Sequence, residues 1–215
     1  PHSESWIFKK TFPSSAVYGF EPHPTRYEEL RNTFPGDLLN CAVTSYTGNI
    51  SGFTEGDDVN AQLYMSENWG SVKEQGLAKS GEIPCTTIDD FLLGNDIQGE
   101  VFLWMDIEGS EYDALRGAVN SMSNGRITAI NVEINFSDMP GLIGGKDIVK
   151  LLRCMNYVPL GCSSPLVDFT KVGPGGSSVI SGYQLSAKDN PHADFLFVYN
   201  PIIASRLQLD FFRVF

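Results

Sequence analysis

The sequence lacks the features that two large classes of protein require. No apolar run reaches the roughly 18 residues of a membrane-spanning helix. Basic residues are scarce and scattered: 15 Lys and Arg stand against 26 Asp and Glu, which gives a formal net charge of −11 at pH 7. Nucleic acids bind to clustered positive charge. We therefore expect no membrane span in this chain and no nucleic-acid partner.

Metal-binding and disulfide patterns are also missing. The four cysteines, Cys41, Cys85, Cys154 and Cys162, lie far apart and form no Cys-x-x-Cys pair. That spacing predicts neither a zinc site nor a dense disulfide framework, so free thiols are expected, with one disulfide left open. The three histidines show no metal-ligand spacing. No G-x-G-x-x-G occurs, which disfavours a hydride-transfer enzyme.

The most informative stretch that is present runs from Val101 to Glu111. An apolar run ends in Asp106, Glu108 and Glu111, grouped around Gly109. The run predicts a strand buried on both faces, and the acids fall at its carboxyl end, where open α/β sheets bind ligands. An alternative is a buried strand followed by an acidic helix start, with Ser110 as cap. The local pattern does not decide between them.

Strand-like and helix-like segments alternate along most of the chain, which predicts an α/β fold with a mainly parallel sheet. One strand is expected over Asp37–Thr44, and one helix over Ser110–Met122. A segment rich in Gly, Ser and Pro, residues 161–193, interrupts the alternation. A loop of that length is usually either functional or disordered, and we expect this one to form a substrate lid. The apolar tail, residues 201–215, is expected to dock on the domain, a partner or a second copy.

Carboxylates at strand ends are the candidates for chemistry. Glu21 follows the Ala16–Phe20 strand, where an acid can accept hydrogen bonds from two ribose hydroxyls. The alternative is a turn acid held between Pro22 and Pro24. Glu133, near the end of the next buried strand, is either a cleft acid or an ion-pair partner.

The remaining candidates are the acids after Val101–Met105 and one histidine. Asp106, Glu108 and Glu111 can serve as a general base or can ligate a hard cation such as Mg²⁺. His192 precedes the last strand and is a candidate general base. His23 is expected to be a turn residue.

Several motifs in this order, over roughly residues 3 to 200, resemble the FkbM family of S-adenosylmethionine-dependent methyltransferases. They are Val17-Tyr18-Gly19-Phe20-Glu21-Pro22-His23-Pro24, Asn40-Cys41-Ala42-Val43, Thr86-Thr87-Ile88-Asp89-Asp90-Phe91-Leu92, Met105-Asp106-Ile107-Glu108-Gly109-Ser110-Glu111, Leu115-Arg116-Gly117 and Val132-Glu133-Ile134. The resemblance implies a Rossmann-like three-layer sandwich. It also implies methyl transfer from S-adenosylmethionine, most often to a hydroxyl oxygen of a small molecule or sugar.

The resemblance also implies roles for individual residues. Glu21, in the turn with Pro22, would bind the adenosyl ribose, Cys41 and Ala42 would line the adenine site, and Asp106 would lie near the methionine moiety. A base for the acceptor hydroxyl would come from Asp106, Glu108, Glu133 or His192.

The family's first strand and glycine-rich turn have no counterpart in this sequence. That strand normally lies between the strands expected at Ala16–Phe20 and Val101–Ile107, so we expect the sequence to belong to a longer polypeptide or another segment to fill the gap. Residues 1–200 are otherwise expected to form one methyltransferase-like domain. The rival hypothesis is an inactive methyltransferase-like domain that acts as a binding or structural module.

Overall fold

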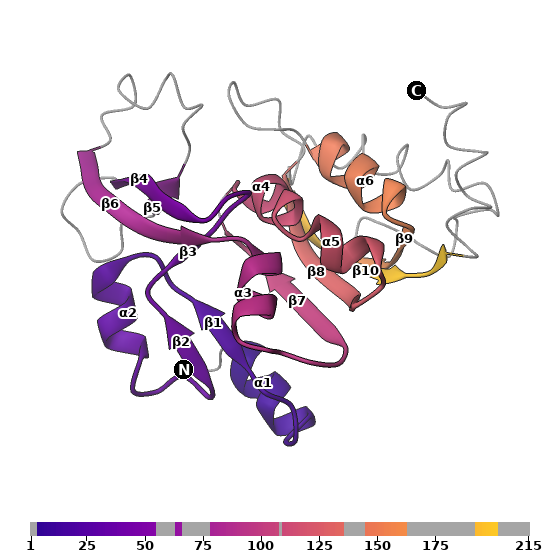
Figure 1. Cartoon of the computed structure of the whole chain (residues 1–215), viewed down its shortest axis with the longest axis horizontal. Coiled ribbons are helices and arrows are strands. Elements are labelled where there is room, and N and C mark those ends of the chain that lie inside the picture. Colours follow the sequence, from indigo (N-terminus) through magenta and orange to yellow (C-terminus); the bar gives the residue numbers. More distant parts are fainter. Residues whose placement is uncertain are drawn as a thin grey trace. The chain divides into compact units, whose positions relative to one another are not determined.

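The computed structural model describes residues 4–54, 63–65, 78–107, 109–135, 145–162 and 192–201. The chain forms two compact units, residues 1–87 and residues 88–215 (Figure 1). Most of the expected lid and tail lie outside the described residues. None of the helices in the described part has the length and apolar character needed to cross a bilayer.

The first unit begins with a helix and a short parallel sheet. Its elements are α1 (Glu4–Thr11), β1 (Tyr18–Phe20), α2 (Pro24–Leu30) and β2 (Asp37–Leu39). β1 and β2 pair in parallel, with Gly19 opposite Leu38. A Cβ on Gly19 would come within 2.6 Å of the Phe34 ring, so the Gly-Phe-Glu-Pro motif needs a glycine here for this close approach.

A second sheet in the same unit has the order β3-β6-β4-β5. Its strands are β3 (Ala42–Val43), β4 (Gly48–Thr54), β5 (Leu63–Met65) and β6 (Ala78–Thr86). Ala42, Ile50, Ile83 and Cys85 form its buried cluster. The prediction of one strand over Asp37–Thr44 is therefore wrong. The segment forms β2 in one sheet and β3 in the other, because the Asn40 side chain ties the intervening residues to the turn after β1.

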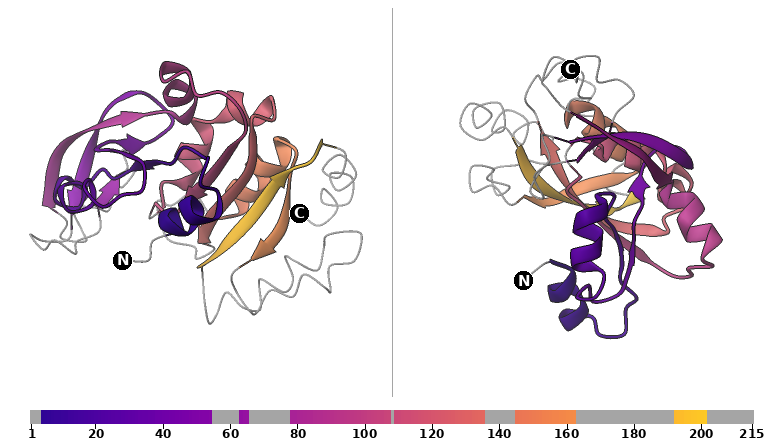
Figure 2. Two further views of the ribbon diagram at one scale, coloured as in Figure 1. Left: turned by 90° about the horizontal axis from the view of Figure 1, so that it is seen from below. Right: turned by 90° about the vertical axis from the view of Figure 1, so that its left-hand side faces the viewer.

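The second unit contains one four-stranded sheet with helices packed against it. Its strands are β7 (Val101–Met105), β8 (Ile127–Asn135), β9 (Tyr157–Cys162) and β10 (His192–Tyr199), in the order β7-β8-β10-β9. Figure 2 shows the yellow β10 between β8 and β9. Its helices are α3 (Ile88–Gly94), α4 (Glu111–Arg116), α5 (Val119–Ser123) and α6 (Gly145–Cys154).

The α/β class is confirmed, but the sheets are mixed rather than mainly parallel. β1 with β2, β3 with β6 and β7 with β8 are parallel pairs. β10 is antiparallel to both of its neighbours, and β4 is antiparallel to β5 and β6. β1 and β7 belong to different sheets, and each pairs with a single neighbour among the described strands.

One face of the second unit's sheet forms the core. Ile130, Val132 and Ile134 on β8 are fully buried, and α5 and α6 pack against this strand. On the other face, Phe102 and Trp104 of β7 are 37% and 47% exposed. The prediction that β7 is buried on both faces is therefore wrong. An apolar run identifies a strand, but it does not show whether a second layer covers it.

The helix expected over Ser110–Met122 is instead two short helices, α4 and α5. Asp89, in the first turn of α3, accounts for the break. Its backbone N–H donates to the Gly117 carbonyl at 2.9 Å, and its two carboxylate oxygens accept from the Asn120 and Ser121 N–H groups, both at 2.9 Å. These N–H groups open α5 and need acceptors at a new helix start. The Thr-x-Asp motif thus fixes the junction between α4 and α5.

We expect Asp89→Ala to lower the free energy of unfolding by about 2 kcal/mol, because two backbone donors lose a charged acceptor. Chemical denaturation measures this change. Asp147→Ala removes a half-exposed acid paired with Lys150 and serves as control, with an expected loss of roughly 0.5 kcal/mol. Equal losses in the two variants would show that Asp89 is no more than a surface acid.

Candidate active site

The carboxyl ends of β1 and β2 meet at one sheet edge because the two strands are parallel. The Glu21 N–H donates to the Leu39 carbonyl at 3.0 Å and extends this pairing past β1. The Asn40 side-chain amide donates to the Glu21 carbonyl at 2.8 Å and to the Pro22 carbonyl at 3.3 Å. Asn40, the residue before Cys41, thus fixes the turn that carries Glu21.

The Glu21 side chain is half-buried and oriented by one hydrogen bond. Its Oε1 accepts from the His23 N–H at 2.8 Å. Within the described part of the chain, Oε2 has no hydrogen-bond partner. His23 is buried and caps α2, with Nδ1 accepting from the Arg26 N–H at 3.4 Å, as its expected turn role requires. Glu21 is therefore a turn acid held by a backbone donor, and it keeps one oxygen available.

Cys41 presents a neutral thiol close to that turn. Burial, and to a smaller extent the nearby Cys85, raises the pKa of the Cys41 thiol to about 11. Cys41, Cys85 and Cys154 are free thiols, as their spacing predicts. The Ala42 side chain is 1% exposed and belongs to the buried cluster of the second sheet, so a contact from Ala42 to a ligand would come from its backbone.

The acids after β7 do not all face the same way. Asp106 is exposed, whereas Glu111 is 4% exposed and turned back toward the backbone. Glu111 Oε1 accepts from the Ile107 N–H at 3.0 Å and from the Gly109 N–H at 3.2 Å. Burial raises the pKa of Glu111 most, its backbone donors oppose this, and Asp106 adds a small upward contribution. Glu108 lies outside the described residues.

One expectation for this turn is corrected. The side chain of Ser110 makes no capping hydrogen bond at the start of α4, so the acid that follows it satisfies the turn instead. Gly109 has a φ of 94°, a conformation that favours glycine. Across the described residues, no three His, Cys, Asp or Glu side chains gather as a metal site would require. The Mg²⁺ prediction thus rests on Asp106 and Glu108.

Glu133 lies on β8 directly opposite Asp194 of β10. Both side chains are half-buried, so the strand register places two acids opposite one another. Asn131, two residues earlier, is 9% exposed, and its Nδ2 has no hydrogen-bond partner among the residues that the structure describes. The sequence prediction missed Asp194 because His192 was expected to precede the last strand, whereas β10 begins at His192. Only the strand register pairs the two acids. His192 lies opposite Asn135.

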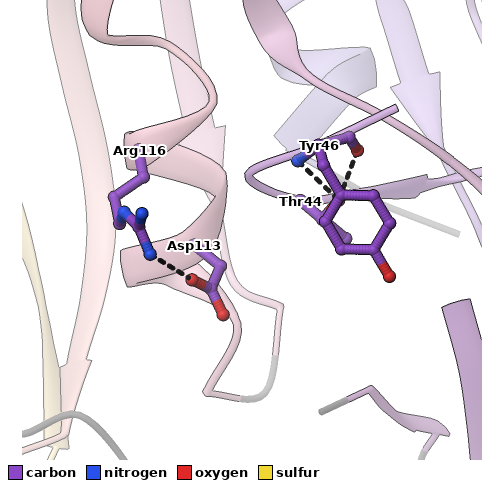
Figure 3. A network of polar contacts seen from close by, with 4 residues as sticks. All are labelled: Thr44, Tyr46, Asp113 and Arg116. Carbon is purple, nitrogen blue, oxygen red and sulfur yellow. Dashed lines mark hydrogen bonds and ion pairs between the residues drawn. The ribbon is translucent and has the colours of Figure 1, made fainter. Parts of the chain in front are cut away.

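Figure 3 shows two local polar contacts, one in each unit. Thr44 Oγ1 donates to the Tyr46 carbonyl at 2.8 Å and accepts from the Tyr46 N–H at 3.3 Å, which closes the turn after β3. On α4, Arg116 and Asp113 form a partly exposed ion pair at 3.8 Å. Asp113 therefore differs from Glu111 on the same helix, since its carboxylate is at the surface.

Comparison with known proteins gives one finding. A family model described as the methyltransferase FkbM domain matches residues 3–159 of the 215. This range includes Glu21, Cys41, Asp106 and Glu133. Neither the comparison with curated proteins nor that with solved structures gives a match.

We expect Cys41 to resist alkylation near neutral pH. With a pKa of about 11, only about one Cys41 side chain in a thousand is a thiolate at pH 8, and the thiolate is the reactive form. Mass spectrometry after iodoacetamide treatment should show Cys41 labelling that rises steeply only above pH 10. The exposed Cys154 provides the internal reference. Fast Cys41 labelling at pH 7 would contradict a neutral, half-buried thiol.

Proposed function

Because the chain belongs to the FkbM methyltransferase family, we propose that it transfers a methyl group from S-adenosylmethionine to a hydroxyl oxygen of a small molecule or sugar. We propose a Rossmann-like methyltransferase sandwich as the framework for this reaction. The observation that supports the proposal best is Glu21, an acid at the carboxyl end of a parallel strand pair with one oxygen held and the other without a partner in the described part.

Glu21 is suited to the ribose of an adenosyl group. A carboxylate accepts hydrogen bonds from two vicinal hydroxyls, and a pre-oriented one loses little conformational freedom when it does so. The His23 N–H provides that orientation, and Asn40 fixes the backbone beneath it. Pro22 restricts the same turn, since its ring fixes one backbone dihedral.

Cys41 fits a position beside the adenine ring. A protonated thiol behaves as a small apolar group, which suits the face or edge of an aromatic base better than a thiolate does. The raised pKa keeps Cys41 in that form near neutral pH. The Ala42 backbone lies next to it and adds peptide groups that can hydrogen-bond to a base edge.

S-adenosylmethionine, when bound, supplies a methyl group on a sulfonium, which is transferred in a single in-line displacement. The protein then has to orient the acceptor and to take its hydroxyl proton. Asp106 is exposed at the end of β7 and is our first candidate for proton acceptor, with a second role as contact to the methionine part. Glu133, Glu108 and His192 are the other candidates.

Glu133 is the candidate base on β8, the strand next to β7. It is half-buried and lies opposite a second half-buried acid, Asp194 of β10. Mg²⁺ at the acids after β7 remains a secondary proposal, which the activity left after EDTA treatment decides.

We expect S-adenosylmethionine to bind the purified protein, and Glu21→Ala to weaken binding by on the order of tenfold to a hundredfold, since two hydrogen bonds to a charged acceptor are lost. Isothermal titration calorimetry measures both affinities. Glu28→Ala is the matched control, because Glu28 is an exposed acid on the neighbouring helix α2, paired at the surface with Arg31.

Two outcomes would contradict the proposal. No heat of binding with the wild-type protein would favour the rival hypothesis, a methyltransferase-like domain used as a binding or structural module. Equal affinities for wild type and Glu21→Ala would remove Glu21 from the cofactor site.

We also expect a methyl label to enter small molecules as an ether. Protein incubated with S-adenosylmethionine carrying a labelled methyl group and a low-molecular-weight cell extract should yield labelled products that survive mild alkali. A methyl ester, formed on a carboxylate, would instead release labelled methanol under alkali. Release of most of the label would exclude the hydroxyl acceptor, and label recovered only in polypeptides would exclude a small-molecule acceptor.

A further inference from the structure

The turn after β7 depends on an acid that the proposed chemistry does not use. Ile107 and Gly109 lie between the end of β7 and the start of α4, and their N–H groups are outside the ladder of the sheet. Both donate to one oxygen, Oε1 of Glu111. The Ser110 N–H donates to the Ile107 carbonyl at 3.3 Å and closes the turn from the other side.

Burial separates Glu111 from the exposed acid that precedes the turn. Glu111 is 4% exposed, while Asp106 is exposed. A buried carboxylate is costly unless hydrogen-bond donors face it, and here two backbone donors do. Because its oxygen is occupied by the turn's own backbone, Glu111 is poorly placed to take a proton from an acceptor molecule.

We propose that Glu111 is a positioning residue, which clamps the Ile107 and Gly109 N–H groups and so fixes the turn that presents Asp106. The proposal deepens the proposed function and rests on it, because the role of Asp106 toward the cofactor belongs to that function. It also explains the spacing of Asp-x-Glu-Gly-x-Glu. The last acid stands four residues after Ile107 and two after Gly109, within reach of both N–H groups.

A positioning role requires the length of the Glu111 side chain, whereas an electrostatic or acid–base role requires its charge. Glu111→Gln keeps the length and the Oε1 acceptor but removes the charge. Glu111→Asp keeps the charge but withdraws the oxygens by about 1.5 Å, the length of one carbon–carbon bond. From 3.0 and 3.2 Å, that change takes both contacts out of hydrogen-bond range. The two variants therefore separate positioning from electrostatic or acid–base roles.

The first measurement is amide hydrogen exchange at Ile107 and Gly109, followed by NMR without any ligand. We expect rates within about threefold of wild type in Glu111→Gln and at least tenfold faster in Glu111→Asp, because exchange reports local opening. Asp113→Asn is the control, since it removes a surface acid from the same helix and should change neither amide. Equal rates in wild type and Glu111→Asp would overturn the clamp.

The second measurement is S-adenosylmethionine affinity by calorimetry on the same proteins. We expect Glu111→Gln to bind within about threefold of wild type and Glu111→Asp at least tenfold more weakly, since small misplacements at a site are costly. Full binding by Glu111→Asp, or loss of binding by Glu111→Gln while its amides stay protected, would overturn the positioning role.

The hydrogen-exchange measurement and the affinity measurement test this inference and the proposed function separately. If the wild-type protein binds no S-adenosylmethionine, the proposed function fails, and the exchange rates still decide whether Glu111 clamps the turn. Thermal unfolding of each variant identifies any global loss of structure. If Glu111→Asp does not fold, Glu111→Gln decides alone: protected amides with wild-type affinity support the clamp, and exposed amides overturn it.

Discussion

The described structure depends on one kind of interaction, in which a side-chain carboxylate accepts hydrogen bonds from backbone N–H groups. Chain segments that leave a strand or start a helix have N–H groups without a partner in regular structure. In this protein Glu21, Asp89 and Glu111 accept from such groups. Each belongs to a different motif of the sequence, so the motifs share one physical role, which is to fix the turns between elements.

This shared role divides the acids by what they can do chemically. Asp89 uses both oxygens on the start of α5, and Glu111 is buried against its own turn. Asp106 is exposed, and one Glu21 oxygen has no partner in the part of the chain that the structure describes. Acids that support the turns are thus distinct from acids that can meet a ligand. A count of carboxylates in a motif would not reveal that difference.

Local patterns predicted the elements more reliably than their arrangement. The strands β1 and β7 lie within the segments where the sequence pattern predicted them. The single helix over Ser110–Met122 was wrong because Asp89, which precedes β7 in the chain, supplies the acceptors for a second helix start. The burial of β7 on both faces was wrong because cover on a strand comes from other elements, which an apolar run does not encode.

The sequence by itself determined the α/β class, the FkbM resemblance and the positions of the acids at strand ends, because these follow from short-range periodicity and motif order. Only the tertiary structure decided which acid faces the backbone and which faces solvent. It also decided that Glu133 lies opposite Asp194, and that Asp37–Thr44 divides between two sheets. Those features depend on strand register and on hydrogen bonds between distant residues, and neither leaves a local pattern in the sequence.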